Sequence, residues 1–297
     1  GRAMELIYTE SDLTNYVNNR VEISRDNPLL IEKFLEDATE IDIDLISDGK
    51  NVLIGGILQH IEEAGIHSGD SSCSFPPYSV PEKKIIQLKK EIKGVAKKLN
   101  VKGLMNAQVA IKNGEFYMIE VNPRASRTIP FLSKCLGQSL AKLASKVLIG
   151  KSLKDLGFSS EIVPTSYAVK APVFPFNKFL KVDPILGPEM KSTGEVMGRG
   201  STFGEAFGKA IKAAGDEIPT KGNIFVSVKD SDKKYLPELC QKFIELGFNI
   251  KATKGSCQFL ADKGIRVEKV NKVLEGRPHI VDEILNNEVC MVINTTE

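Results

Sequence analysis

The sequence predicts an α/β protein made of an antiparallel sheet with helices, followed by a small, doubly wound parallel sheet. Three observations carry this prediction. Alternating strands joined by Asp48-Gly49 and Asn113-Gly114 indicate hairpins in the first part. Strands alternate with helices after residue 222, as in parallel sheets. A length of 297 residues suits about two domains. We therefore expect domains at 1–215 and 223–297, a linker at 216–222, and a second sheet that is incomplete because the chain stops directly after its last strand.

Composition excludes several classes of protein. A net charge of +2 predicts neither a nucleic-acid nor a membrane partner. No apolar run approaches the ~20 residues that span a bilayer. Five scattered cysteines without metal spacing favour free thiols in a reducing compartment, hence the cytoplasm. The opening GRAMELIYTE has neither a signal-peptide pattern nor an initiator Met, which predicts a piece of a longer protein.

The first part reads as a series of short elements. A helix is expected at 10–20 and an apolar strand at 29–35. Next comes a strand in which Glu40, Asp42 and Asp44 form an acidic face, followed by the strand 52–58. For some of these three acids, the plain explanation is an alternation in which the polar side chains face solvent. The polar loop 60–74 could offer N–H groups and a His to an anion, or be ordinary surface. A helix at 81–99 precedes the second hairpin.

The hairpin around Asn113-Gly114 allows two registers. A two-residue loop would place Gln108 and Glu120 on opposite faces. A three-residue loop, with Gly114 left-handed in a bulge, would pair Ile111 with Glu115. The three-residue loop would place several polar residues on one face, together with the apolar side chains of Phe116 and Met118 beneath them. We therefore favour this loop. The polar members of that face are Asn106, Gln108, Glu120 and Asn122.

The remaining elements follow in order. Helices are expected at 131–148 and 203–214, with irregular strands at 164–200 between them. The second part should contain strands at 224–228, 248–253 and 289–294 and helices at 233–247, 267–276 and 278–287. Polar residues follow these strands, where ligands of open α/β sheets bind. A phosphate site and ordinary turn chemistry explain these residues equally well.

A carboxylate, amides and guanidinium groups gather where the second strand of this hairpin ends. Oxygen ligands such as those of Gln108, Glu120 and Asn122 suit Mg²⁺ or Mn²⁺. Arg124 and Arg127 suit phosphate or carboxylate oxygens. Glu120 could instead be a general base, but the arginines and a metal would lower its pKa, so we assign it as a ligand.

Long motifs distributed along nearly the whole of this chain resemble the large subunit of carbamoyl-phosphate synthetase. They are IEKFLEDATEIDID (31–44), HIEEAGIHSGDS (60–71), the stretch 103–131, PFNKF (175–179), GPEMKSTGEVMG (187–198) and VNKVLEGRPHI (270–280). The resemblance covers the latter part of the carbamoyl-phosphate-forming half, which has an ATP-grasp fold, and the regulatory domain, which is similar to methylglyoxal synthase. It amounts to less than a third of that subunit.

The resemblance implies an ATP-dependent ligase that phosphorylates carbamate in pyrimidine and arginine biosynthesis. Gln108, Glu120 and Asn122 would hold Mg²⁺ or Mn²⁺, and Arg124 and Arg127, with Asn122, would serve catalysis. The ATP contacts it implies are Arg2, Lys33, Leu35, Glu40, Gly65, Ile66, His67, Ser68, Gln108 and Glu120.

The resemblance also implies a UMP- or IMP-type effector site in the second domain. Its residues would be Lys233, Thr253, Ser256, Lys272, Asn294, Thr295 and Thr296. Ser256 stands where a Thr is usual. Ala171 replaces the Glu of ornithine-activated members, and Ala cannot neutralise an amine, so we expect no strong ornithine response.

The implied partners are a glutaminase small subunit and the rest of the large subunit. Because the glycine-rich phosphate lid would precede Gly1, we expect little or no turnover from this piece alone. Two alternatives stay open: another ATP-grasp carboxylate-amine ligase, and a non-catalytic nucleotide-binding regulator. GIHSGDS and the attached regulatory domain argue against the first.

Overall fold

The computed structural model describes residues 4–19, 28–179 and 182–295. The chain divides into two compact units, Gly1–Asp216 (unit 1) and Glu217–Glu297 (unit 2). Unit 1 contains α1(Glu10–Asn19), β1(Thr39–Asp48), β2(Val52–Glu63), β3(Cys73–Phe75), α2(Glu82–Lys98), β4(Lys102–Lys112), β5(Glu115–Asn122), α3(Ile129–Leu136), α4(Leu140–Leu148), β6(Tyr167–Val173), η1(Phe176–Lys178), β7(Gly194–Gly200) and α5(Phe203–Ala214).

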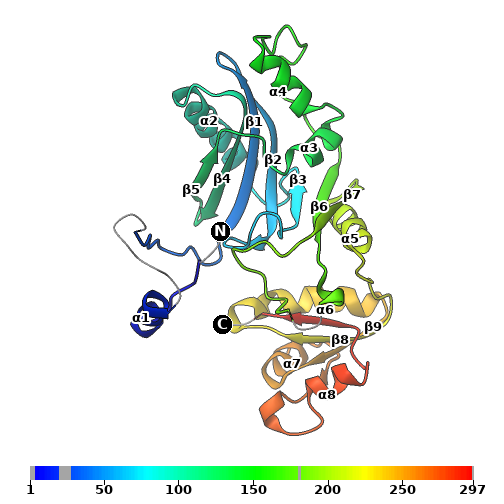
Figure 1. The fold of residues 1–297 in the computed structure, drawn as a ribbon. Helices are drawn as coiled ribbons and strands as arrows, with labels where there is room; N and C mark the ends of the chain where they lie inside the picture. The colour runs from blue at the N-terminus through cyan, green and yellow to red at the C-terminus, as the bar shows by residue number, and fades with distance from the viewer. Residues whose placement is uncertain (1–3, 20–27, 180–181, 296–297) are drawn as a thin grey trace. The chain divides into compact units, whose positions relative to one another are not determined.

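Unit 1 is built on a seven-stranded sheet in the order β5-β4-β1-β2-β3-β6-β7 (Figure 1). Every neighbouring pair is antiparallel, which confirms the predicted sheet type. Short connections make this pairing natural, because antiparallel neighbours need only a tight turn between them.

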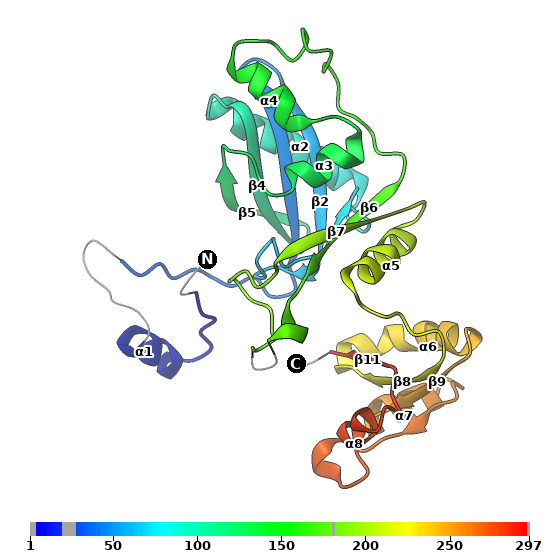
Figure 2. The ribbon, with the colours of Figure 1, turned by 45° about the vertical axis from the view of Figure 1, so that its right-hand side comes forward.

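Helices cover both faces of this sheet. Leu88, Ile92 and Ala96 of α2 pack against the apolar residues of β1, β2 and β4 on one face. Helices α3 and α4 cover the other face (Figure 2). There Leu132 lies so close to Gly56 that a Cβ on Gly56 would be 2.3 Å from Leu132 Cδ2. Gly56 thus lets α3 pack directly on β2.

Two predicted elements of unit 1 differ from the structure. Residues 29–35 form no strand, and Leu30 and Ile31 are 77% and 71% exposed. The helix expected at 131–148 is two helices, because Gly137 adopts a left-handed φ of 66° and ends α3. Ser139 then caps α4 by accepting a hydrogen bond from Lys142 N.

Unit 2 contains β8(Gly222–Ser227), η2(Asp230–Tyr235), α6(Leu236–Glu245), β9(Phe248–Ala252), α7(Lys254–Ala261), β10(Glu268–Lys269), η3(Val273–Glu275), α8(Ile280–Leu285) and β11(Met291–Asn294). The sheet order is β10-β9-β8-β11 and all pairs are parallel, as predicted. Helix α6 lies on one side of the sheet, and α7 and α8 lie on the other (Figure 2).

Two details of unit 2 correct the sequence prediction. The helix expected at 267–276 is absent; this stretch holds β10 and the 3₁₀ turn η3. Residues 254–261, expected to begin as a polar turn, form α7, and Thr253 is its N-cap residue. Within the described residues, no helix combines the length and the apolarity that crossing a membrane requires.

Candidate functional site

The β4–β5 hairpin has a two-residue turn, so the predicted three-residue loop is wrong. Lys112 pairs directly with Glu115. Asn113 and Gly114 between them have φ values of 52° and 78°. Two successive positive φ values define a type I′ turn, whose twist matches that of antiparallel strands and which Asn-Gly favours.

A bulge further along β5 nevertheless produces the predicted polar face. The register shifts at Ile119, which leaves Gln108 opposite Glu120 and Asn106 opposite Asn122. Residues that pair across two strands point to the same side of a sheet. The shared face of these four polar side chains is therefore confirmed, although an extra residue in the strand creates it and not the turn.

The predicted apolar floor of this face is wrong. Phe116 lies opposite Ile111, and Met118 lies opposite Val109. Phe116, Ile111 and Val109 belong to the core cluster packed on α2. The bulge reverses the alternation only beyond Met118, so the residues before it keep the register of a two-residue turn.

A row of acidic side chains on β1 lies beside the polar face. Asp42 pairs with Gln108, and Asp44 pairs with Asn106. Glu40, Asp42 and Asp44 are only 4%, 2% and 1% exposed. Solvated alternation is therefore the wrong explanation for all three: the carboxylates are buried and need partners inside the protein.

Asp44 is held by hydroxyl groups that precede α3. Ser126 Oγ donates to Asp44 Oδ1 at 2.7 Å, Thr128 Oγ1 donates to Asp44 Oδ2, and Asn106 Nδ2 donates to Oδ1 at 3.1 Å. Burial raises the pKa of Asp44 to about 6, against these hydrogen bonds, which lower it.

Asp42 has the opposite electrostatic environment. Burial would raise its pKa, but hydrogen bonds from His60, Gln108 and Asn106 and the charge of His60 outweigh burial and lower it. Burial would lower the pKa of His60, yet the neighbouring Cys73 and Asp42 raise it well above its usual value. Asp42 and His60 thus form a buried carboxylate–imidazolium pair, with Nε2 and Oδ2 3.0 Å apart.

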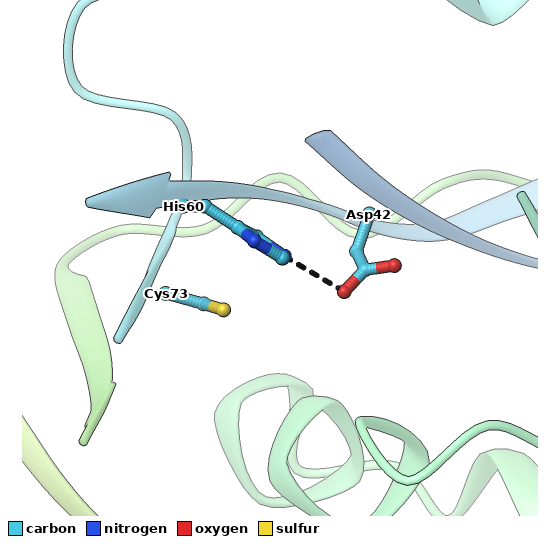
Figure 3. Close-up of side chains that lie close together, drawn as sticks. All are labelled: Asp42, His60 and Cys73. Carbon is cyan, nitrogen blue, oxygen red and sulfur yellow. Dashed lines mark hydrogen bonds and ion pairs between the residues drawn. The ribbon is translucent and has the colours of Figure 1, made fainter. Parts of the chain in front are cut away.

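Asp42, His60 and Cys73 converge from three strands (Figure 3). Each offers one ligand atom, and these atoms lie within 4.8 Å of one another, so the three could in principle hold a metal ion. Asp42 and His60 already neutralise each other in this arrangement. His60 Nδ1 makes no hydrogen bond to any described residue and lies 3.8 Å from Glu40 Oε1.

The exposed end of the polar face presents oxygen ligands. Glu120 is exposed, Gln108 and Asn122 are half-buried, and Asn122 Nδ2 donates to Glu120 Oε1 at 2.7 Å. This bond leaves the amide oxygen of Asn122 available. One carboxylate with two amide oxygens is a hard donor set, which fits Mg²⁺ or Mn²⁺.

The loop after β2 is fixed beside this face. The backbone N–H of Gly65 donates to the carboxylate of Glu40. His67 N donates to Gly187 O at 2.9 Å, and the buried Lys170 Nζ donates to Ser68 O at 2.9 Å. Burial and the nearby charge of Arg127 lower the pKa of His67. The structure thus brings the predicted residues 65–68 next to Glu40 and Arg127.

The other predicted nucleotide contacts are less closely gathered. Lys33 is exposed and Leu35 half-buried, and a Cβ on Gly65 would lie 3.0 Å from the ring of Phe34 between them. The guanidinium of Arg124 donates to the adjacent Ala125 O, at 3.2 Å. Arg2 lies outside the described residues.

In unit 2, polar residues meet at the carboxyl ends of three adjacent parallel strands. Ser227 Oγ lies 3.2 Å from Thr253 Oγ1, and Ser227 O accepts a hydrogen bond from Thr295 N at 3.1 Å. Asn294 ends β11 opposite Ser227. The structure thus brings Thr253, Asn294 and Thr295 together around Ser227, which the sequence prediction did not include.

The remaining predicted effector residues surround the start of α7. Lys233 Nζ is 3.2 Å from the point that a Cβ on Gly255 would occupy, and it pairs with Asp230 at 2.6 Å. Ser256 is buried, and its Oγ has no hydrogen-bond partner among the described residues. Lys272 is exposed beside η3, and Thr296 lies outside the described residues.

The sequence predicted Asn106 on the polar face, but it did not predict that Asp42, Asp44 and His60 lie beside that face. The signal that could have found them is the alternation of three acids on β1 combined with Asn106 and Gln108, two residues apart on β4. An acidic strand face opposite an amide-bearing one predicts direct hydrogen bonds. Only the strand order, which places β1 between β2 and β4, makes this visible.

The sequence matches two family models. Residues 1–156 match the carbamoyl-phosphate synthase L chain, ATP binding domain, and residues 235–297 match the MGS-like domain. Among solved structures, the biotin carboxylase domain of a single-chain bacterial carboxylase covers 61% of this chain and 47% of its own, with a TM-score of 0.48 and 16% identity.

Full-length relatives resemble the whole chain. The carbamoyl phosphate synthase large chain of Pseudomonas syringae pv. tomato is 54% identical over 100% of this chain and 28% of that protein. The large chain of Vibrio cholerae is 50% identical over 99% of this chain and 27% of that protein. The chain thus spans a little over a quarter of the relatives it matches. With more than half of its residues inside the ATP-binding model, the chain belongs to the carbamoyl-phosphate synthase large-chain family.

Proposed function

We propose that unit 1 binds ATP with Mg²⁺ or Mn²⁺ and forms part of the site at which carbamate is phosphorylated. The observation that carries the proposal is the shared face of Gln108, Glu120 and Asn122, in a chain of this family. Phosphoryl transfer needs positioning and neutralisation of charge more than a protein nucleophile. The three side chains fit that need, because they offer oxygen ligands without a reactive group.

Each group of the site has a simple task in this proposal. Glu120, Gln108 and Asn122 would hold the metal ion, which neutralises phosphate oxygens when bound. Arg127, next to His67 and the loop 65–68, would contact the anionic oxygens of the nucleotide or of carbamate, and Arg124 would do the same. Glu40 would contact the ribose, while Lys33, Leu35 and Arg2 would line the base and phosphates.

The setting of this reaction is also a proposal. The relatives are named large chains, which suggests a small-chain partner, and we propose that it supplies ammonia from glutamine. The product would serve pyrimidine and arginine biosynthesis in the cytoplasm. Residues 1–215 would form the ATP-grasp part and 223–297 the regulatory domain, joined by 216–222.

We further propose that unit 2 binds the phosphate of a nucleotide effector of the UMP or IMP type. Support comes from the buried hydroxyl of Ser256 in the first turn of α7, which has no hydrogen-bond partner within the described part of the chain, with Lys233 beside it. A helix N-terminus, hydroxyl groups and a cation together suit a phosphate. Thr253, Asn294, Thr295, Thr296 and Lys272 would complete the site.

Two titrations of the complete large chain test these proposals. Mn²⁺-ATP binding should weaken at least tenfold in Glu120→Gln and be unaffected in Ser256→Ala. UMP or IMP binding should weaken at least tenfold in Ser256→Ala and be unaffected in Glu120→Gln. Isothermal titration calorimetry measures both. If Glu120→Gln binds Mn²⁺-ATP like the parent chain, the metal site is elsewhere; if Ser256→Ala keeps the affinity for both nucleotides, the effector site is elsewhere.

A further inference from the structure

Gln108 offers a metal its amide oxygen only when the amide is turned the right way. A glutamine side chain ends in one acceptor oxygen and one NH₂ donor, which exchange places when the group rotates by half a turn. A metal ion requires the oxygen. Something on the other side of Gln108 must therefore hold the NH₂ group and prevent the exchange.

Asp42 is the group that does this. It lies directly opposite Gln108 on β1, so the two side chains share a face of the sheet, and the Gln108 amide lies close enough to act as a donor that lowers the pKa of Asp42. An ionised carboxylate only accepts hydrogen bonds, so the amide must present its NH₂ to Asp42. The amide oxygen is then directed away from β1, while Glu120 pairs with Gln108 from the opposite strand.

Asp42 is itself fixed and kept charged. His60 Nε2 donates to Asp42 Oδ2 at 3.0 Å, and Asn106 Nδ2 lies 3.4 Å from Oδ1. Asp42 is 2% exposed, so water does not compete for these bonds. A buried carboxylate with a cationic partner and amide donors holds one geometry, which is what the support of a metal ligand requires.

We propose that Asp42 is a positioning residue that locks the Gln108 amide with its oxygen turned toward the bound metal ion. The proposal rests on the proposed function, because it assumes that Gln108 is a ligand. It gives the two amide ligands matching supports: Glu120 holds the NH₂ of Asn122 at 2.7 Å, and Asp42 holds that of Gln108. Glu120 is also a ligand in this scheme, whereas Asp42 acts only through Gln108.

The test exchanges donor and acceptor between the two residues. Asp42→Asn can offer its own NH₂ to Gln108, which then turns its NH₂ toward the metal; Mn²⁺ binding should weaken about tenfold or more. In Asp42→Asn/Gln108→Glu, the new amide donates to one oxygen of the new carboxylate, and the other oxygen faces the metal. This double variant should bind Mn²⁺ at least as tightly as the parent chain. Gln108→Glu alone, with two carboxylates in contact, should bind more weakly than the double variant.

The matched control is Asp44→Asn, which removes a neighbouring buried carboxylate of the same strand face that contacts Asn106, Ser126 and Thr128. It should change Mn²⁺ affinity less than threefold, which separates orientation from a general loss of negative charge. Mn²⁺ alone is titrated into the complete large chain, and the EPR signal of free Mn²⁺ reports binding. The Mn²⁺ sites that are lost in Glu120→Gln show which part of the titration curve reports the proposed metal site.

Each outcome decides the matter. Weak binding in Asp42→Asn, rescued in the double variant, supports the proposal. Affinity within twofold of the parent chain in Asp42→Asn, or purely additive effects in the double variant, overturns it while the Glu120→Gln loss still upholds the metal site. Should Asp42→Asn alone fail to fold, the double variant decides: it must fold and bind Mn²⁺, and its failure to bind sinks the proposal. If Glu120→Gln loses no site, the proposed function itself is wrong.

Discussion

Two neighbouring aspartates on one strand face show how local partners set charge at the residue scale. Asp42 and Asp44 are equally buried, yet the pKa of Asp42 is lowered and that of Asp44 is raised to about 6. The difference comes from His60, a cation in contact with Asp42. Among the described residues, the donors to Asp44 are neutral hydroxyl and amide groups. The sequence showed three alternating acids, but it could not show which of them meets the histidine.

The raised pKa of Asp44 predicts a loss of stability as pH increases. The folded state binds this proton more tightly than the unfolded chain, so the contribution is fully present below pH 3.8 and is lost as pH rises to about 6. A shift of about two units corresponds to about 3 kcal/mol. The difference in free energy of unfolding between the parent chain and Asp44→Asn should fall by about that amount from pH 4 to pH 7, measured by denaturant unfolding. A flat difference would show that Asp44 does not titrate in this range.

At the element scale, the β4–β5 hairpin shows what a sequence pattern can and cannot locate. Asn113-Gly114 correctly predicted a turn, and the polar residues correctly predicted a common face. The two facts are incompatible in a regular hairpin, so an extra residue must be accommodated somewhere. The sequence prediction placed it in the turn; the structure places it at Ile119, where no Gly or Pro marks a bulge.

The location of the bulge gives Gly114 a restricted role. Gly114→Val places a β-branched residue at a φ of 78° and should cost about 1–3 kcal/mol of stability. Because the register at Glu120 is set at Ile119, Mn²⁺ affinity of the folded protein should not change. Thermal unfolding and Mn²⁺ titration of the complete large chain measure the two effects, with Gly114→Asn as the control that tolerates this φ. Loss of Mn²⁺ affinity in the folded Val variant would contradict this assignment of the register.

Other elements were misjudged for equally physical reasons. Residues 29–35 and 267–276 have apolar patterns typical of a strand and a helix. In the structure, residues 29–35 form neither a helix nor a strand, and residues 267–276 hold the short strand β10 and the 3₁₀ turn η3. Tertiary context can override local propensity in such segments. Helix α7 was missed because Thr-Lys-Gly-Ser reads as a turn, although Thr253 is a favourable N-cap residue.

On the scale of the whole molecule, each unit has its own core and its own candidate site. Unit 1 matches the ATP-binding model over residues 1–156, and unit 2 includes the MGS-like match over 235–297. The buried core of unit 2 comes from β8, β9, α6 and α7, and Met291 and Ile293 of β11 pack against it. Changes in the stability of one unit need not alter ligand binding in the other.

A buried ion pair in unit 2 makes this independence testable. Lys251 Nζ lies 3.0 Å from Glu283 Oε2, and the more exposed Glu268 is 3.5 Å away. Glu283→Gln leaves the lysine charge poorly paired and should destabilise unit 2 by about 3 kcal/mol. A calorimetric scan should show one transition at lower temperature, while Mn²⁺ binding below that transition keeps its parent affinity. A parallel loss of Mn²⁺ binding would mean that the units unfold together.

The bulge at Ile119 also has a practical consequence. It separates the hairpin into a distal segment, which carries the turn, and a proximal segment, which carries the proposed metal ligands. In a regular strand pair, a change in loop length shifts the pairing register along the whole ladder. In this hairpin, the extra residue is already accommodated between the turn and the proposed metal ligands. The exposed Asn113-Gly114 tip is therefore a suitable place to splice in a reporter peptide or a fluorophore attachment point that can follow the hairpin while the metal site is titrated.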